Sequence, residues 1–143
     1  MIAIGSDHGG FQLKEKVIAH LKNRGFEVKD FGTYDEKSCD YPVYGRAVAN
    51  SVAAGEAEKG IVICTTGLGI AMTANKVKGI RAAVCSDTVS AGLTRLHNDA
   101  NVLSMGAGII GENLALSIVD TFLDTEFSNE ERHLRRIRLI EEE

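Results

Sequence analysis

The chain has 143 residues, of which 44% are hydrophobic and 25% are charged, and its formal net charge is −4. A general nucleic-acid-binding protein would need a basic face, so this charge argues against that class. No apolar run approaches the roughly 20 residues of a membrane-spanning helix, and no basic segment followed by an apolar one suggests a signal peptide. We therefore expect a cytoplasmic protein with one domain over residues 1–143 that binds neither nucleic acid nor membranes.

Short apolar, β-branched runs alternate with longer amphipathic runs along the chain. They predict strands at residues 2–6, 26–31, 60–64, 80–85 and 101–105. They predict helices at residues 11–22, 42–55, 67–76, 87–97 and 112–123, and a strongly charged C-terminal helix at 129–142. Strands that alternate with helices pair in parallel through right-handed crossovers. We expect an α/β fold: a three-layer α/β/α sandwich around a five-stranded, doubly wound, Rossmann-like sheet.

Ligands of doubly wound sheets bind beyond the carboxyl ends of the strands. Four polar or glycine-containing segments follow expected strands, at residues 7–10, 64–69, 86–87 and 106–108. These segments are the candidates for a functional site.

The segment CTTGLG at residues 64–69 carries the strongest chemical signal. Its glycines let backbone N–H groups approach a ligand, and the following helix adds its positive N-terminal end. A thiol at that end can act as a base or nucleophile, although a buried, inert Cys64 is the structural alternative. Met72 replaces the third glycine of a dinucleotide fingerprint, and the segment has no P-loop lysine.

Asp7 and His8 lie where the first strand meets the first helix. An aspartate at this position also serves as a helix cap, whereas the two glycines after His8 suggest clearance for a ligand. Tyr41 either contacts a ligand or covers the end of the sheet. His97 closes the fourth expected helix, where it either compensates the helix dipole or acts as an acid–base group.

The arginines of the last helix differ in their carboxylate neighbours. Arg135 has Glu131 four residues before it and Arg138 has Glu142 four residues after it, but Arg132 and Arg136 have no carboxylate at three or four residues. Most charge runs are solvated, salt-bridged faces. Two guanidinium groups that are four residues apart and lack partners suit a phosphate.

The remaining cysteines, Cys39 and Cys85, form neither a disulfide pattern nor zinc-binding pairs with Cys64, which fits reduced thiols in the cytoplasm. No two of the four histidines stand at metal-ligand spacing. We expect no metal and no cofactor.

Several motifs occur together in one order: GSDHGGF at residues 5–11, DYP at 40–42, CTTGLG at 64–69, ANK at 74–76, GIRA at 79–82, HNDANVL at 97–103 and RH at 132–133. Over nearly its whole length the chain resembles the ribose-5-phosphate isomerase B family, which includes galactose- and allose-6-phosphate isomerases. The chain departs from the family's common pattern in three places: at Thr65, at Gly108 and at the pair Glu130-Glu131.

The resemblance implies a metal-free aldose–ketose isomerase that interconverts ribose 5-phosphate and ribulose 5-phosphate through an enediolate. It implies that Cys64 is the base, that His97 assists ring opening and that Asp7 is the acid–base carboxylate. The implied intermediate is stabilised by Thr66 and by the backbone of Gly67, Leu68 and Gly69. The implied substrate contacts are Tyr41 and Asn98, and the implied phosphate ligands are His8, Arg132 and Arg136.

The family is typically a homodimer with sites built across the interface, and pairing of dimers into a tetramer is left open. A hexose-phosphate isomerase, for allose or galactose 6-phosphate, is the alternative within the class. A non-catalytic nucleotide- or phosphate-binding module is the alternative outside it.

Overall fold

The computed structural model describes residues 1–142 and contains the expected parallel sheet. The strand order is β2-β1-β3-β5-β4, and every neighbouring pair is parallel. The strands are β1 (Ile2–Ser6), β2 (Val28–Asp30), β3 (Lys59–Cys64), β4 (Ala82–Val84) and β5 (Val102–Gly106). The three central strands are buried almost throughout, as their apolar runs predict.

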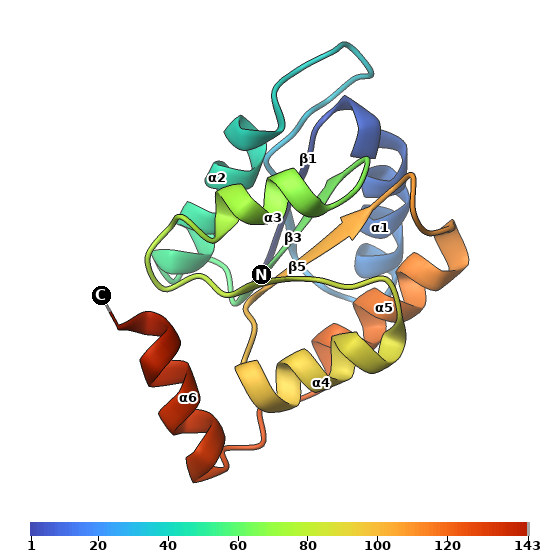
Figure 1. Ribbon diagram of the computed structural model, residues 1–143. Coiled ribbons are helices and arrows are strands. Elements are labelled where there is room, and N and C mark those ends of the chain that lie inside the picture. Colours follow the sequence, from blue (N-terminus) through green and yellow to red (C-terminus); the bar gives the residue numbers. More distant parts are fainter. Residues whose placement is uncertain (143) are drawn as a thin grey trace.

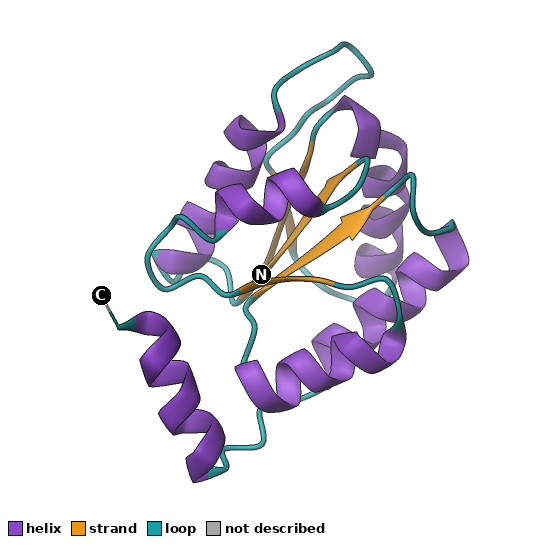
Figure 2. Ribbon diagram, viewed as in Figure 1, coloured by secondary structure: helices purple, strands orange, loops and turns teal. Residues whose placement is uncertain are grey.

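Helices cover both faces of this sheet (Figures 1 and 2). They are α1 (Phe11–Asn23), α2 (Tyr41–Ala53), α3 (Leu68–Ala74), α4 (Thr88–Asn98), α5 (Glu112–Asp124) and α6 (Glu131–Glu141), with a short 3₁₀ helix η1 (His8–Gly10) before α1. The predicted α/β sandwich is confirmed. No helix among residues 1–142 is long and apolar enough to cross a membrane.

The side chains of the strands separate into two hydrophobic cores because successive residues point to opposite faces. One core contains Ile4, Ile61 and Leu103 together with residues of α1, α4 and α5. The other contains Val62 and Val102 together with residues of α2 and α3. Both faces are therefore closed by helices, and the edges formed by the strand ends are left for ligands.

The two edge strands are shorter than predicted. The pattern extended the second strand back to Phe26 and the fourth to Ile80, but β2 begins at Val28 and β4 at Ala82. Phe26 packs against one core and its N–H donates to Leu21 of α1, while Ile80 is buried in the other core. Ile80 is buried and Phe26 is partly buried, but neither is paired in the sheet. Their apolar character led the strand prediction to include them.

Helix α6 stands apart from the three layers (Figure 1). It begins at Glu131 rather than at residue 129, because Asn129 has a positive φ of 58° and Glu130 is the N-cap. Residues 125–130 link it to α5 without regular secondary structure. The helix is attached to the rest of the chain mainly through its contacts with α4 and Arg81.

We predict opposite effects of alanine at two glycines. A Cβ at Gly60 of β3 would lie 2.6 Å from Val48 Cγ1 and 3.1 Å from Val52 Cγ2, so Gly60→Ala should lower the free energy of unfolding by about 1–3 kcal/mol through overpacking. Gly92 of α4 is the matched control, because its Cβ would meet only Thr121 Cγ2 at 3.5 Å. Gly92→Ala should raise the same free energy by about 0.5–1 kcal/mol through helix propensity. Equal destabilisation of both variants in urea would contradict this packing.

Candidate active site

The thiol of Cys64 lies at the carboxyl end of β3, where the chain turns into α3. Cys64 is only 5% exposed, and its sulfur accepts the backbone N–H of Gly67 at 3.2 Å. Gly67 has a φ of 77°, a conformation that glycine adopts without strain. The Ser104 hydroxyl donates to the Gly67 carbonyl at 2.6 Å, and a Cβ on Gly67 would lie 2.8 Å from the Met105 carbonyl carbon. The turn that presents the sulfur is therefore held against β5.

The rest of the predicted loop surrounds this turn. The Leu68 N–H donates to Thr66 Oγ1 at 3.2 Å, and both of these residues are exposed. A Cβ on Gly69 would lie 2.5 Å from Cζ of Tyr41, so the tyrosine ring covers the first turn of α3. Tyr41 is the first residue of α2 rather than part of the preceding loop, because the helix begins one residue before the expected Pro42. The ring is thus fixed beside the Cys64 loop.

Asp7 and His8 also lie at this edge. The Asp7 N–H donates to the Ile63 carbonyl at 3.3 Å, which places the aspartate beside the end of β3. Its Oδ1 accepts the Gly10 N–H at 3.1 Å, so Asp7 caps η1 as the structural alternative proposed. His8 is exposed, and its Nδ1 accepts the Cys39 N–H at 3.2 Å.

Thr65 joins three of the four candidate segments. A Cβ on Gly9 would lie 2.3 Å from Thr65 Oγ1, and a Cβ on Gly108 would lie 3.0 Å from Thr65 Cγ2. The Gly108 N–H donates to the Thr65 carbonyl at 2.8 Å. The Thr65 side chain therefore packs between Gly9 and Gly108. Thr65 and Gly108, which both differ from the family pattern, are thus in direct contact.

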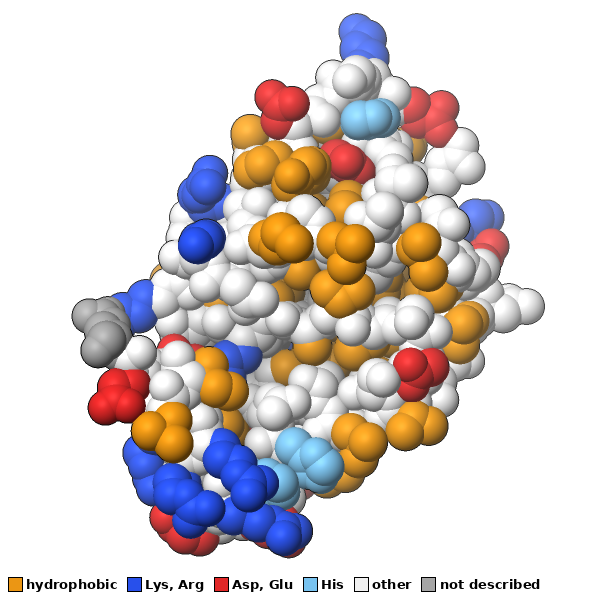
Figure 3. All heavy atoms as spheres, in the orientation of Figure 1, with side chains coloured by type: hydrophobic (Ala, Val, Ile, Leu, Met, Phe, Trp, Pro, Cys, Tyr) orange, Lys and Arg blue, Asp and Glu red, His pale blue; other side chains and the backbone are white. Residues whose placement is uncertain are grey.

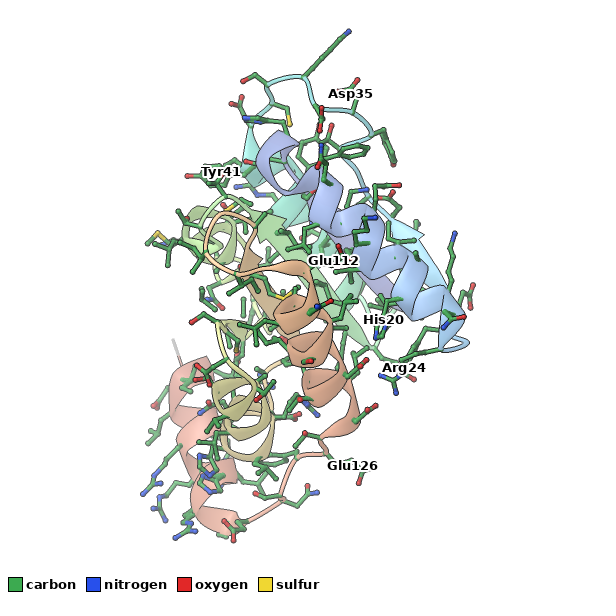
Figure 4. The ribbon with its side chains drawn as sticks, turned by 90° about the vertical axis from the view of Figure 1, so that its right-hand side faces the viewer. His20, Arg24, Asp35, Tyr41, Glu112 and Glu126 are labelled. Atoms are coloured by element: carbon green, nitrogen blue, oxygen red, sulfur yellow. The ribbon has the colours of Figure 1, made fainter. Side chains whose placement is uncertain are left out.

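A cavity of about 500 Å³ opens beside the segments at residues 7–10 and 106–108, lined in part by His8, Gly9, Lys16 and Ala107. Its far side includes Glu112, the first residue of α5, which Figure 4 labels. The candidate segment at residues 86–87 has another function. Asp87 caps α4 by accepting the Ser90 N–H at 2.6 Å, a bond that lowers the pKa of this exposed carboxyl.

The other predicted site residues do not lie at the carboxyl edge of the sheet. His97 and Asn98 end α4, just before β5 begins at Val102. A five-residue strand such as β5 spans about 16 Å, and its far end lies beside Cys64. Arg132 and Arg136 belong to α6. In Figure 4, Tyr41 and Glu126, which lies on the link to α6, are at different ends of the molecule. One chain therefore does not bring all the predicted residues together.

His133 was not among the predicted site residues. Its ring stacks on His97 with 4.5 Å between centroids and 19° between planes, and it is buried although its helix is largely exposed. Arg81 completes the attachment of α6: its guanidinium donates to Glu141 at 2.7 Å and to the carbonyls of Asn98 and Asp99. The RH motif at residues 132–133 could have pointed to His133 as a functional residue. The neighbouring sequence does not indicate that its ring stacks on His97.

The arginine pairing on α6 partly corrects the expectation. Arg132 does have a carboxylate partner, because its NH2 donates to Glu130 Oε2 at 3.1 Å. The partner is the N-cap residue two positions earlier, which the three- and four-residue rule does not cover. Arg138 pairs with Glu131 at 3.0 Å and not with Glu142, which lies beyond the helix. Within residues 1–142, Arg136 forms no ion pair with a carboxylate.

These observations first define a class: a doubly wound α/β protein whose polar groups gather beyond the carboxyl ends of β1, β3 and β5, where small ligands bind. The family model described as Ribose/Galactose Isomerase matches residues 2–140. The chain belongs to this family. The resemblance seen in the sequence and the class of enzyme, a sugar-phosphate isomerase, are both confirmed, and a non-catalytic module is set aside.

Three relatives illustrate the similarity. The chain is 50% identical to ribose-5-phosphate isomerase B of Escherichia coli over 139 residues, which cover 97% of this chain and 93% of the relative. The structure of Clostridium thermocellum ribose-5-phosphate isomerase B matches with a TM-score of 0.96 and 54% identity, covering 98% and 94% of the two chains. That of Mycoplasma genitalium ribose-5-phosphate isomerase B, with bound ribulose-5-phosphate, matches with a TM-score of 0.93 and 41% identity, covering 98% and 93%.

We predict that His133 makes the fold sensitive to acid. Burial of its ring lowers the pKa of His133, the nearby charges of His97, Arg132 and Arg136 lower it further, and Glu130 opposes them. The pKa in the folded state thus lies below the unfolded value of about 6.5, and the unfolded chain binds more protons below that pH. This stabilising contribution should be complete above about pH 6.5 and should decrease as the pH falls towards the folded pKa.

Urea unfolding near neutral pH and again at about pH 5.5 measures this loss. The variant His133→Gln should lose less stability between the two pH values than the parent chain. An identical pH dependence in the two proteins would show that His133 does not carry the effect.

Proposed function

We propose that the chain interconverts ribose 5-phosphate and ribulose 5-phosphate. The observation that carries the proposal is the thiol of Cys64, which lies at the end of β3 with a backbone N–H directed at its sulfur and with Thr66 and Asp7 in adjoining turns. The names and ligand of the relatives favour the pentose phosphate, and hexose 6-phosphates are the alternative substrates within the family. The free thiols of Cys39, Cys64 and Cys85 support a location in the cytoplasm.

In the proposed reaction Cys64, as the thiolate, removes the proton from C2 of the open-chain aldose. The electron pair of the C–H bond forms the C1–C2 double bond of an enediolate, and the negative charge moves to the carbonyl oxygen on C1. Asp7 moves a proton between the two oxygens, and the thiol returns its proton to C1 to give the ketose. No oxidant or cofactor is needed, because one carbon is oxidised as its neighbour is reduced.

The loop offers hydrogen-bond donors to the negative oxygen. Thr66 Oγ1 accepts the Leu68 N–H, so the threonine hydroxyl keeps its own proton to donate. The Gly69 N–H lies in the same first turn of α3, beneath the ring of Tyr41. Donors fixed before the reaction begins stabilise the charge that develops in the transition state without reorganising. Here Tyr41 restricts access of water from one side.

The remaining groups are proposed to come from a second copy of the chain. His97 and Asn98, for ring opening and substrate contact, lie about one strand length from Cys64 in the same chain. Arg132 and Arg136, for the phosphate, belong to α6, which packs against α4. In a homodimer the α4 end and α6 of one protomer face the Cys64 edge of its partner. His8 then meets the phosphate from the Cys64 side. Further pairing into a tetramer is compatible with this arrangement.

Exposed apolar side chains support the dimer. Met72 of α3 is 67% exposed and Val89 of α4 is 68% exposed, and Leu93 and Leu96 continue the stripe on α4. Figure 3 shows hydrophobic side chains gathered on this face of the molecule. Soluble proteins rarely leave a large contiguous apolar surface open to water. A second copy would cover it and complete the site at the same time.

We expect Cys64→Ser to lower kcat by a factor of about 10²–10⁴, because it removes the general base. The dissociation constant for ribose 5-phosphate should change less than about threefold, since the phosphate contacts remain. Cys85→Ala is the control: burial raises the pKa of Cys85 to about 11, so it stays a thiol, and its replacement should leave kcat near the parent value. A parent-like kcat for Cys64→Ser would refute the thiolate mechanism. Assaying pentose and hexose phosphates in parallel decides the substrate.

We expect Arg136→Ala to raise KM for a phosphorylated sugar about tenfold or more and to leave KM for the free sugar nearly unchanged. Arg135→Ala, which removes the neighbouring exposed guanidinium, is the matched control. At a substrate concentration well below the parent KM, where Arg136→Ala alone is nearly inactive, mixing Cys64→Ser with Arg136→Ala subunits should restore about a quarter of the parent activity, because half of the random dimers would carry one intact site. No recovery on mixing would argue against a site shared between protomers.

A further inference from the structure

Lys14 of α1 is a fully buried charged residue outside the groups used above. Its side chain is 0% exposed, and its Nζ lies 2.8 Å from Asp30 Oδ2 and 3.1 Å from Glu15 Oε1. The ammonium also lies 5.3 Å from the centroid of the Phe11 ring and 5.8 Å from that of Tyr34. A lysine is almost never buried in this way unless its partners fix it. The position therefore needs a physical reason.

Stability alone does not provide one. Removing two charges from water costs about as much as their attraction returns, so a buried ion pair is often no more stable than a hydrophobic pair of the same volume. What such a pair does supply is a defined geometry between the two elements that carry it. Here those elements are α1 and the end of β2.

Asp30 connects the ion pair with Lys14 to residues 31–40, which contain no helix or strand. Its Oδ1 accepts the Gly32 N–H at 2.8 Å, and its carbonyl accepts the Tyr34 hydroxyl at 3.0 Å. The backbone of the segment then pairs with Ser6, which immediately precedes Asp7: the Ser6 N–H donates to Gly32 and the Thr33 N–H donates to Ser6, each at 2.6 Å. Gln12, half a turn before Lys14, adds a hydrogen bond to Glu36.

The far end of the same segment reaches the candidate site. The Cys39 N–H donates to His8 Nδ1 at 3.2 Å. A ring nitrogen that accepts a hydrogen bond carries no proton, so the neutral His8 ring holds its proton on Nε2, where it can be donated to an anion. Figure 4 shows the segment, with Asp35 labelled, close to the N-terminal end of α1. Lys14 therefore contacts the beginning of the segment at residues 31–40 through Asp30, and His8 contacts its end through Cys39.

We propose that Lys14 is a positioning residue for His8. It holds residues 31–40 on α1 through Asp30, so that Cys39 keeps the His8 ring in the tautomer and orientation that donate from Nε2 to the phosphate of the substrate. This inference rests on the proposed function, in which His8 is a phosphate ligand. Lys14 does not touch the substrate.

The test is Lys14→Met, which keeps the length and apolar stem of the side chain and removes the ammonium. We expect KM for ribose 5-phosphate to rise about tenfold and kcat to change less than about threefold, because the phosphate contact weakens while Cys64 stays in place. Arg24→Met, at the C-cap of the same helix, is the matched control. It removes ion pairs to Asp120 and Asp124 of α5 and should leave both constants at the parent values.

Hydrogen–deuterium exchange provides a readout that does not depend on activity. The amides of residues 31–40, including that of Cys39, should exchange faster in Lys14→Met and at the parent rate in Arg24→Met. Should Lys14→Met fail to fold, Asp30→Asn gives the same measurements, since the Asp30 side chain is 29% exposed and an asparagine oxygen still accepts the Gly32 N–H.

The outcomes separate the two proposals. A parent chain without isomerase activity would overturn the proposed function, and the exchange data would still decide whether Lys14 orders the segment. An active parent with unchanged KM and unchanged exchange in the folded variant would overturn the assignment of Lys14. Equal rises in KM for Lys14→Met and Arg24→Met would overturn it as well, because they would indicate a general loss of stability.

Discussion

The candidate site depends on three loops that pack closely against one another at glycine residues. At the carboxyl edge of the sheet, Gly9, Gly67 and Gly108 each allow a neighbouring backbone or Thr65 to approach to a distance that a Cβ would prevent. Close packing of this kind leaves little freedom for adjustment. The Cys64 sulfur, the Thr66 hydroxyl and the Asp7 carboxylate therefore have fixed relative positions before any ligand binds. Preorganised polar groups are the usual source of electrostatic stabilisation in enzymes.

A second constraint comes from the direction of the chain. In a parallel α/β fold, each helix returns to the amino edge of the sheet, so groups at a helix C-terminus and groups at a strand C-terminus lie at opposite edges. His97 and Cys64 are separated for this reason. In the proposed homodimer, two molecules would combine both groups in one active site, and the exposed apolar side chains on α3 and α4 would form the contact between them. Dimer formation would then be required for catalysis.

Much of this arrangement could be predicted from the sequence. The apolar periodicity located the five strands and six α-helices of residues 1–142, although not the short 3₁₀ helix η1. The rule for strand ends selected the loops that carry Asp7, Cys64 and Gly108. The errors have physical causes. Phe26 and Ile80 pack against the cores without pairing in the sheet, so they lengthened the predicted edge strands. Arg132 pairs with an N-cap residue, which lies outside the helical spacing that was considered.

Two features depend on contacts that local sequence does not contain. Lys14 stands among polar residues in the segment FQLKEKV and has the appearance of a solvent-facing position. Its ammonium contacts Asp30, at the end of β2, and the ring of Tyr34, in the segment that follows β2. His133 is similar: its burial follows from stacking on His97 of another helix. Each needed the tertiary structure to reveal its surroundings.

The loose attachment of α6 also bears on how such an enzyme can change. The helix contributes one buried histidine and no residue of either hydrophobic core, yet it carries the guanidinium groups proposed for the phosphate. Mutations on its outer face would therefore change the proposed phosphate contacts while leaving the two hydrophobic cores intact.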